Sequence, residues 1–396
     1  MNTQYAVTLG LVPLTLLLFA QVSLVSPIAN AIAIPVVSLL VTPLALAGGL
    51  LPEPLATPLL VAAHELMRWL AGLLQWFSGA PLAVWNAPVP PVWLFALAMF
   101  GTVWLLAPRG WPTRWLGAFT WIPLLAAQPD GPAPGTVRML AFDVGQGMAV
   151  LVETAGHRLL YDTGPAYGPE SNAGSRVIVP YLRARGIGRL DGLVVSHGDT
   201  DHSGGALAVL RDIKVGWSLS SLNPSHPVTR ALPLHRRCVA GQRWEWDGVR
   251  FEMLHPTAAS YADTALKTNA RSCTLRIVAG DKAILLAGDI EARQEAELVA
   301  RSGTALRSDV LLVPHHGSGT SSTTAFLDTV QPGFAVFQVG YRNRYRHPKK
   351  EVVERYEQRA VKTLRSDRAG AIRIELGAGT HMEGYRVSRP RYWHDR

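Results

Sequence analysis

The sequence has 396 residues and a formal net charge of +9, a length sufficient for two or three folded units. Its charges are very unevenly placed. Residues 1–126 contain three cationic and two anionic side chains, and the remainder contains 35 and 27. This distribution argues against one uniformly soluble domain and predicts an apolar N-terminal part joined to a basic, soluble C-terminal part.

The N-terminal part contains a series of apolar runs. A helix needs about 20 mostly apolar residues to cross a bilayer. The runs cover 5–25, 31–51, 58–77, 91–107 and 115–127. The third carries His64, Glu65 and Arg68, so it is either amphipathic or faces a helical bundle, and the last is short. We expect residues 1–126 to be a multi-pass membrane segment. A large buried soluble core is the alternative, but so few charges over five runs fit lipid better.

A proline- and glycine-rich stretch, residues 127–136, predicts a linker and a domain boundary. After it the pattern changes to short strand-like runs such as VRMLAF, GLVVS and AILLAGD. Helical segments are expected between them, at 291–301, 322–329 and 349–360. Strands with interleaved helices predict that residues 137–396 form an α/β domain.

The stretch SHGDTDH directly follows the apolar run GLVVS and begins a helix. It offers four side chains in six positions as metal ligands: His197, Asp199, Asp201 and His202. Imidazole nitrogens together with hard carboxylate oxygens suit Zn, Mn or Mg. The alternative is a solvated loop in which Asp199 or Asp201 caps the helix. The complete pattern favours the metal site.

Three further candidates stand where predicted strands end: His255, Asp289 and His315. Strand ends of an open α/β sheet meet at one edge, where sites commonly form. For His255, which precedes a proline, an ordinary loop residue is the alternative. The two cysteines, Cys238 and Cys273, form no Cys-x-x-Cys pattern, and a single pair is no argument for a disulfide. We expect two buried thiols.

The order HGDTDH, a Gly-Asp after a strand, and then PHHGS resembles the metallo-β-lactamase superfamily. Within it, FDVGQG, YDTG and HHGS resemble the C-terminal domain of the ComEC family, the DNA-internalisation channel of natural competence. The run SPIANAIAIPVVSLLVTPLALAGGLL resembles the last part of that family's membrane domain. The resemblance implies a membrane α-helical segment followed by an αββα sandwich.

The same resemblance implies two divalent metal ions, Zn, Mn or Mg. His197, Asp199 and His255 would hold the first, and Asp201, His202 and His315 the second, with Asp289 bridging both. The sequence departs from the pattern at Met148, where the branch usually has an acidic residue. Asp199 stands where the wider superfamily usually has histidine, and this makes the first site harder.

Two such cations activate water and stabilise an in-line displacement at phosphorus. Asp201, Asp289 and His347 are the catalytic candidates. His347 and His316 could protonate the leaving oxygen or bind phosphate, although a surface histidine is the alternative for each. The candidate substrate-binding residues are Asn269, Ser272, His316, Ser318 and Arg344.

The segment YRNRYRHPKK, residues 341–350, places five cations among two tyrosines. Cations that follow phosphates and rings that stack on bases suit single-stranded DNA. A solvated basic loop, or one that contacts anionic lipid, is the alternative. Arg109 and Arg114 flank a short loop expected in the cytoplasm. The resemblance favours an extracytoplasmic metal domain facing incoming DNA.

We therefore expect a cell-membrane protein of DNA uptake during natural transformation, with a nuclease-type hydrolase that degrades one strand of the incoming DNA. The alternatives are a membrane-anchored metallohydrolase of small esters and a catalytically silent transport fragment. ComEC-family members normally carry a further large N-terminal portion. The expectation is thus a fragment or a split gene, with the missing part as a partner chain.

Overall fold

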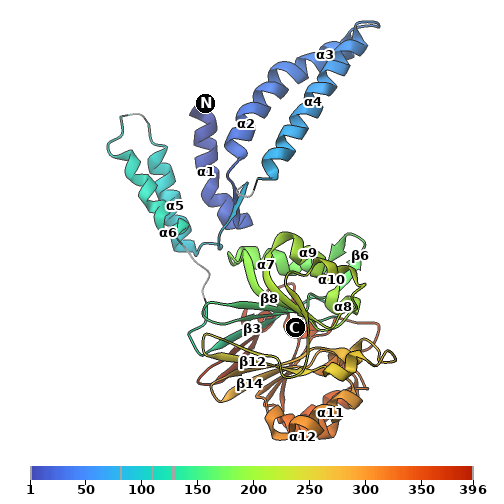
Figure 1. Cartoon of the computed structure of the whole chain (residues 1–396). Helices are drawn as coiled ribbons and strands as arrows, with labels where there is room; N and C mark the ends of the chain where they lie inside the picture. Colours follow the sequence, from blue (N-terminus) through green and yellow to red (C-terminus); the bar gives the residue numbers. More distant parts are fainter. Residues whose placement is uncertain (1, 81–82, 109, 127–130, 395–396) are drawn as a thin grey trace. The chain divides into compact units, whose positions relative to one another are not determined.

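The computed structural model describes residues 2–80, 83–108, 110–126 and 131–394 (Figure 1). The chain divides into two compact units, residues 1–129 with 182–187, and residues 130–181 with 188–396. Residues 127–130 of the expected linker lie outside the described part of the chain.

The first unit is helical. Its elements are α1 (Asn2–Phe19), α2 (Ser26–Pro35), the π-helix η1 (Val36–Val41), α3 (Thr42–Leu50), α4 (Ala56–Ser78), α5 (Val92–Leu105), the 3-10 helix η2 (Arg114–Trp121) and α6 (Ile122–Leu125). From α2 to α3 the chain forms one continuous helix, Ser26–Leu50, with a mean hydropathy of 2.2. Among the described residues, this is the one helix long and apolar enough to cross a membrane. Figure 1 shows it returning into α4, against which α3 packs.

Two of the expected apolar runs have a different structure. The run at 5–25 is not one helix, because α1 ends at Phe19 and Ala20 adopts a left-handed backbone with φ 54°. The chain then forms β1 (Gln21–Ser23), which pairs with β2 (Val84–Asn86). The run at 115–127 is mostly 3-10 helix. Shorter apolar helices cover Ala6–Phe19 and Val92–Leu105.

The second unit contains two large sheets. The first has the order β10-β9-β8-β5-β4-β3-β18-β19, and the second β11-β12-β13-β14-β15-β16-β17. The strands of the first are β3 (Val137–Ala141), β4 (Val150–Glu153), β5 (Arg158–Tyr161), β8 (Arg189–Val195), β9 (Lys214–Ser220), β10 (His235–Arg237), β18 (Ile372–Leu376) and β19 (Thr380–Gly384). Those of the second are β11 (Arg243–Trp246), β12 (Val249–His255), β13 (Thr274–Ala279), β14 (Lys282–Leu286), β15 (Val310–Leu312), β16 (Phe334–Phe337) and β17 (Lys362–Arg365).

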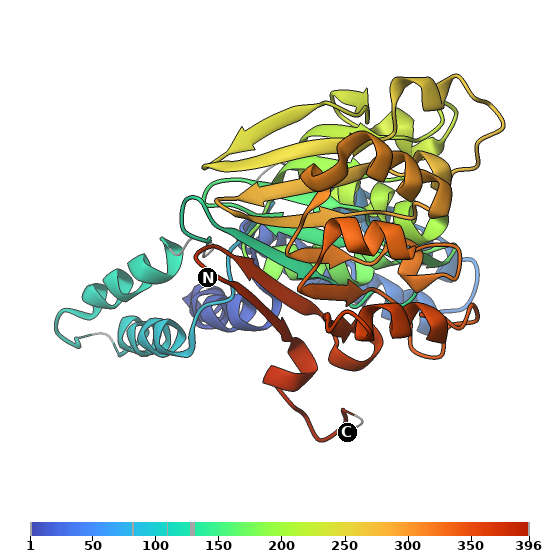
Figure 2. The ribbon, with the colours of Figure 1, turned by 90° about the horizontal axis from the view of Figure 1, so that it is seen from below.

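The two sheets face each other across one apolar core. Alternate residues of a strand point to the same face, so Val137 and Met139 of β3 enter this core with Leu275 and Ile277 of β13. The outer face of the second sheet is covered by α11 (Ala292–Ser302), α12 (Thr324–Val330) and α13 (Lys350–Glu357). Seen from that side, these helices lie in front of the strands (Figure 2). They confirm the helices expected at 291–301, 322–329 and 349–360.

On the first sheet, α8 (Thr200–Ser203) and α9 (Ala206–Asp212) follow β8, and α9 packs against β9. The remaining helices are η3 (Gly174–Ile178), α7 (Val179–Ala184), α10 (Pro227–Ala231), η4 (Ala258–Tyr261), η5 (Asn269–Arg271), η6 (Gly303–Leu306), η7 (Pro314–Gly317), α14 (Ser366–Ala369) and α15 (Tyr385–Ser388). A small hairpin joins β6 (Ala166–Gly168) to β7 (Ser171–Asn172). Helices outside two face-to-face sheets make the expected αββα sandwich.

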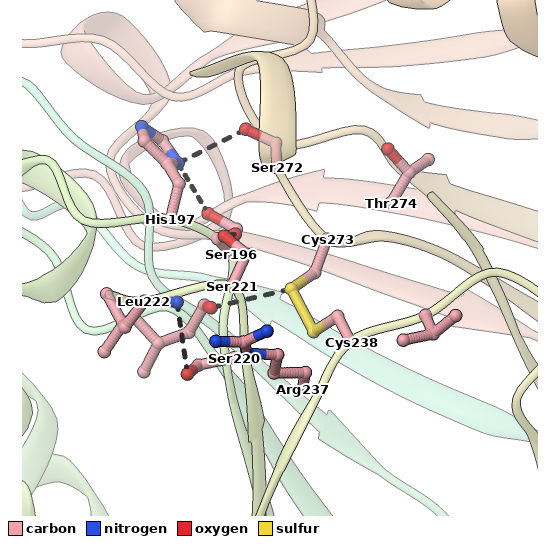
Figure 3. Close-up of a disulfide and its surroundings, with 12 residues drawn as sticks. Ser196, His197, Ser220, Ser221, Leu222, Arg237, Cys238, Ser272, Cys273 and Thr274 are labelled. Carbon is pink, nitrogen blue, oxygen red and sulfur yellow. Dashed lines mark hydrogen bonds between the residues drawn. A yellow bond between two sulfur atoms is a disulfide. The ribbon is translucent and has the colours of Figure 1, made fainter. Parts of the chain in front are cut away.

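The expectation of two free thiols is wrong. Cys238 and Cys273 form a disulfide with a Cα–Cα distance of 5.8 Å (Figure 3). Cys238 follows β10 of the first sheet, and Cys273 precedes β13 of the second. The bond therefore ties the two sheets together across a sequence separation of 35 residues.

Removing this disulfide is expected to lower the free energy of unfolding by roughly 2–4 kcal/mol, because the bond restricts the unfolded chain. The change is the double substitution Cys238→Ala/Cys273→Ala, measured by urea unfolding of the detergent-solubilised full chain. Reductant should destabilise the wild type by a similar amount and leave the variant unchanged. Equal unfolding curves for both proteins would contradict this expectation.

Candidate metal centre

Two pairs of neighbouring parallel strands bring the candidate residues together. In the first sheet β5 pairs with β8, and in the second β14 pairs with β15. The carboxyl ends of parallel strands lie at the same edge of a sheet. Asp162 directly follows β5, His197 comes soon after β8, and Asp289 and His316 come soon after β14 and β15. The site is therefore built at one edge of the sandwich from segments far apart in the sequence.

One group of side chains is compact and largely buried. Ligand atoms of Asp201, His202, Asp289 and His316 all lie within 4.8 Å of one another. His202 Nε2 is 3.2 Å from His316 Nε2 and 3.1 Å from Asp289 Oδ1. Asp201 Oδ2 is 3.5 Å from His316 Nε2. We call these four residues the buried cluster.

The outer nitrogens of its two histidines have fixed partners. His202 Nδ1 lies 2.8 Å from the Asp162 carboxylate, and His316 Nδ1 lies 2.8 Å from the Gln338 carbonyl oxygen. A carboxylate and a carbonyl only accept hydrogen bonds, so each Nδ1 carries a proton and donates it. In neutral imidazoles the two Nε2 lone pairs then face each other at 3.2 Å, which requires a positive charge between them.

The charges of the buried cluster favour such a positive charge. Burial alone lowers the pKa of His202, but the carboxylates of Asp289, Asp162 and Asp201 outweigh it and raise that pKa well above its usual value. Burial likewise raises the pKa of Asp289, yet the charges of His202 and His316 hold it well below the usual range. Either protons or a divalent cation could balance the negative charge of these carboxylates, and a divalent cation would also bind both Nε2 lone pairs.

A second group, the open cluster, lies on the other oxygen of Asp289. His197 Nε2 is 4.0 Å and His315 Nε2 is 3.7 Å from Asp289 Oδ2, and Asp199 Oδ2 is 3.7 Å from His197 Nε2. His197 Nδ1 is 2.9 Å from Ser196 Oγ, whose own proton is donated to Asp162. His197 Nδ1 therefore donates, and its Nε2 lone pair faces the cluster.

Two of the buried polar atoms left without a hydrogen-bond partner fit metal ions. Within the described part of the chain, His197 Nε2 and Asp289 Oδ1 are buried without a hydrogen-bond partner. A buried polar atom without a partner is costly, and both atoms are donors to divalent cations. The side chain of Asp289 presents one oxygen to each cluster, as expected of a residue that bridges two cations.

The histidines after β15 differ from the assignment made on the sequence. His316, not His315, lies in the buried cluster, and His315 lies beside the open one. Both have left-handed backbone conformations, φ 48° and 55°, followed by Gly317 at φ 79°. These conformations turn two adjacent side chains to opposite oxygens of Asp289: His316 is 3.6 Å from Oδ1, and His315 is 3.7 Å from Oδ2.

His255, expected to hold the first metal, hydrogen bonds elsewhere. Its Nε2 lies 2.9 Å from the Ala270 carbonyl oxygen. In the second sheet β12 is separated from β14 by β13, and this sets the end of β12 apart from that of β14. Asn269 approaches instead, with its Nδ2 3.5 Å from His315 Nε2.

Two serines expected to bind substrate contact the protein itself. Ser272 Oγ accepts a hydrogen bond from the Asp289 amide at 3.1 Å and lies 3.3 Å from His197 Nδ1. It thus orients two metal-ligand candidates. Ser318 Oγ lies 3.1 Å from Thr320 Oγ1.

The basic loop 341–350 reaches the open cluster through His347, whose ring centroid is 5.9 Å from that of His315. Burial, followed by the charges of His316 and His315, lowers the pKa of His347 to about 4. It is therefore neutral at pH 7, which favours hydrogen bonding to phosphate over proton donation. Arg344 is exposed and lies over the Tyr345 ring at 4.7 Å.

Asp162 was missed as a site residue. It is fully buried, accepts from the Ser196 amide and hydroxyl at 2.6 and 2.7 Å, and orients His202. The available signal was its position at the end of the strand in YDTG, like the other candidates. Met148 contributes its backbone, which donates to the Asp201 carbonyl at 3.1 Å, while its side chain packs in the core between the sheets.

The disulfide lies close to Ser196, His197 and Ser272 (Figure 3). The Cys273 amide donates to the Ser196 carbonyl at 2.9 Å, and Ser272 is its immediate neighbour. The Cys238 amide donates to the Ser220 carbonyl at 3.0 Å. The bond therefore fixes the segment that carries Ser272 against the strand end that carries His197.

An αββα sandwich with paired His/Asp clusters at one sheet edge fits the class of metal-dependent hydrolases. Residues 142–340 match the sequence model of the Metallo-beta-lactamase superfamily, and residues 1–112 match that of the family described as Competence protein. The chain belongs to the metallo-β-lactamase superfamily, in the branch that joins this domain to a competence-family segment.

Three relatives match most of this chain. Competence protein ComA of Neisseria gonorrhoeae is 39% identical over 387 residues, which are 95% of this chain and 51% of that protein. Uncharacterized protein YcaI of Escherichia coli is 30% identical over 420 residues, 99% of this chain and 51% of its own. Recombination protein 2 of Haemophilus influenzae is 31% identical over 411 residues, which are 95% of this chain and 50% of that protein.

The chain spans about half the length of these relatives. Together with the apolar helix Ser26–Leu50, the competence-family match indicates a membrane protein.

Proposed function

We propose that this chain takes part in DNA uptake and that its second unit hydrolyses phosphodiester bonds in one strand of the DNA. The relatives named for competence and recombination support the first part. The observation that carries the second is the pair of Nε2 atoms of His202 and His316, which face each other at 3.2 Å beside Asp289.

The residues divide into two metal-binding sets. The buried cluster of Asp201, His202, Asp289 and His316 would hold one divalent cation. The open cluster, His197, Asp199 and His315 with the second oxygen of Asp289, would hold the other. Two divalent cations supply Lewis acidity and lower the pKa of water toward neutrality. The Asp289 carboxylate fixes the separation of the two sets, and Asp162, Ser196, Ser272 and Gln338 keep the histidine lone pairs directed inward.

The loop 341–350 supports a polymeric anionic substrate. His347 connects it to the open cluster, and the Tyr345 ring is stacked on His347 at 5.8 Å. Tyr341 and Tyr345 are 64% and 46% exposed, and an arginine lies over each ring, so a base would displace that guanidinium group to stack there. The neighbouring arginines can contact the phosphates. Neutral His347 would donate a hydrogen bond to a phosphoryl oxygen.

For the location, we propose a multi-pass protein with the second unit on the extracytoplasmic side of the membrane. Disulfides persist in oxidising compartments and are rare in the cytosol of mesophiles. The Cys238–Cys273 bond therefore supports this side, where the unit would meet incoming DNA.

Purified full chain in detergent should cleave an end-labelled single-stranded oligonucleotide when Mn²⁺, Zn²⁺ or Mg²⁺ is added. The kcat/KM for p-nitrophenyl esters should be at least about 100-fold lower, because the basic side chains of loop 341–350 can contact the phosphates along a strand but not a small ester. EDTA should abolish the DNA cleavage. Cleavage of the esters alone would identify a small-ester hydrolase, and activity on neither substrate would identify a transport component without catalysis.

A further inference from the structure

A cavity of about 660 Å³ lies along one side of the sandwich, where the outermost strands of the two sheets leave it open. The metal centre lies instead at an edge formed by the ends of strands. The cavity is formed by β9 and β10 of the first sheet and β11 of the second. Its size falls in the range of roughly 300–1,000 Å³ typical of ligand pockets. None of the residues placed in the two metal-binding clusters lines it.

Three tryptophans from the two sheets form an aromatic group in this cavity. The ring centroids of Trp217 and Trp244 are 5.3 Å apart, and those of Trp217 and Trp246 are 5.8 Å apart. Trp244 stacks on Phe251 with 7° between the planes, and Trp246 stacks on His157 with 7°. The tryptophans pack against the core yet remain partly exposed. Because these rings are held rigidly, they would lose little entropy on binding a flat ring at their exposed surface.

The charged lining of the cavity is entirely cationic. Arg236 and Arg243 line it together with His235, and no aspartate or glutamate is part of the lining. Both arginines are exposed. Among the residues that the structure describes, the side chain of Arg243, which is 74% exposed, has only a distant ion pair with Glu252 at 3.9 Å. Their guanidinium groups are therefore accessible to an external anion. Glu245, between the two β11 tryptophans, lies outside the lining.

Flat apolar faces beside accessible cations fit a ligand that has aromatic rings joined by anionic groups. We infer that this tryptophan–arginine cavity is a second binding site, separate from the metal centre, for single-stranded nucleic acid. Bases stack on the tryptophans, and Arg236 and Arg243 contact the phosphates. The choice of nucleic acid rests on the proposed role in DNA uptake, whereas binding itself requires no hydrolysis. An anionic lipid surface would satisfy the arginines but would leave the stacked faces unused.

The test measures fluorescence anisotropy of a labelled 12-mer of deoxythymidine with the full chain in detergent and EDTA. The variant Arg236→Glu/Arg243→Glu should bind at least tenfold more weakly than the wild type. The matched control is Lys214→Glu/Arg250→Glu, which makes the same charge change at exposed positions of β9 and β12 outside the cavity. The control should stay within threefold of the wild type. Equal binding by the two double variants would overturn the inference.

Two further measurements separate stacking, lipid binding and catalysis. An abasic 12-mer should bind the wild type at least fivefold more weakly than the thymidine 12-mer, and Trp246→Leu should remove that difference. Loss of binding to phosphatidylglycerol vesicles by Arg236→Glu/Arg243→Glu, with oligonucleotide binding retained, would assign the cavity to the membrane surface and overturn the inference. Asp289→Ala should retain oligonucleotide binding, so a failure of the proposed hydrolysis would leave this result intact.

Discussion

The substitution Asp289→Ala is expected to remove both divalent cations and nearly all hydrolytic activity. The Asp289 carboxylate is shared by the buried and the open cluster. Its Oδ1 lies 3.1 Å from His202 Nε2, and its Oδ2 lies 4.0 Å from His197 Nε2. Loss of an outer partner of a metal ligand already costs roughly 10–100-fold in affinity or activity. Loss of a shared ligand should exceed that range. Metal content after dialysis and the rate of single-strand cleavage measure the two effects.

Asp281→Ala is the control for this experiment. Its side chain is 82% exposed and pairs with Lys282 at 3.5 Å, outside both clusters. It should retain both cations and wild-type cleavage. An Asp289→Ala protein that folds, binds two equivalents of metal and cleaves DNA at the wild-type rate would remove the basis for the proposed hydrolysis.

The strand ends made much of the site predictable. His197, Asp199, Asp201 and His202 are close in sequence after one apolar run, so any fold that buries that run as a strand keeps them together. Asp289 also comes soon after an apolar strand, and the strands of an α/β sheet bring such ends to a common edge. The αββα sandwich was predicted from the family resemblance. Local sequence patterns alone predicted an α/β domain and not this arrangement of its layers.

The choice among neighbouring histidines was not predictable, because it depends on backbone conformation. His315 and His316 are adjacent in PHHG, and only their left-handed φ angles of 48° and 55° decide which one enters the buried cluster. Non-glycine residues adopt this region rarely, so no sequence preference announces it. His255 was selected for ending a strand, but strand order, a long-range property, determined its neighbours.

The disulfide and the ends of the apolar helices depended on similar long-range information. Cys238 and Cys273 lie in different sheets, and only the packing of the sandwich brings their Cα atoms to 5.8 Å. In the first unit the apolar run 5–25 gave no sign that the chain leaves the helix at Ala20. The pairing of β1 with β2, more than sixty residues later in the chain, accounts for that break.

The two metal-binding clusters are expected to differ in affinity, with one cation bound at least about tenfold more tightly. In the buried cluster His202 and His316 are fully enclosed, and Asp162 and Gln338 fix their rings. Such outer partners contribute roughly 10–100-fold to metal affinity. In the open cluster the Asp199 side chain is 43% exposed and hydrogen bonds with Thr268 at 2.7 Å, so its carboxylate must compete with water and with that hydroxyl.

Titration of the metal-free full chain with Mn²⁺ or Zn²⁺ by calorimetry measures this difference. Asp199→Ala should lose only the weaker equivalent, and His316→Ala should lose the tighter one. Two equal affinities in the wild type, or loss of the same equivalent in both variants, would contradict the asymmetry. Because the proposed hydrolysis would use both cations, activity should follow occupancy of the open cluster. Protein with one equivalent would then be folded and metal-bound yet inactive, and the supply of the second cation would determine when DNA is cleaved.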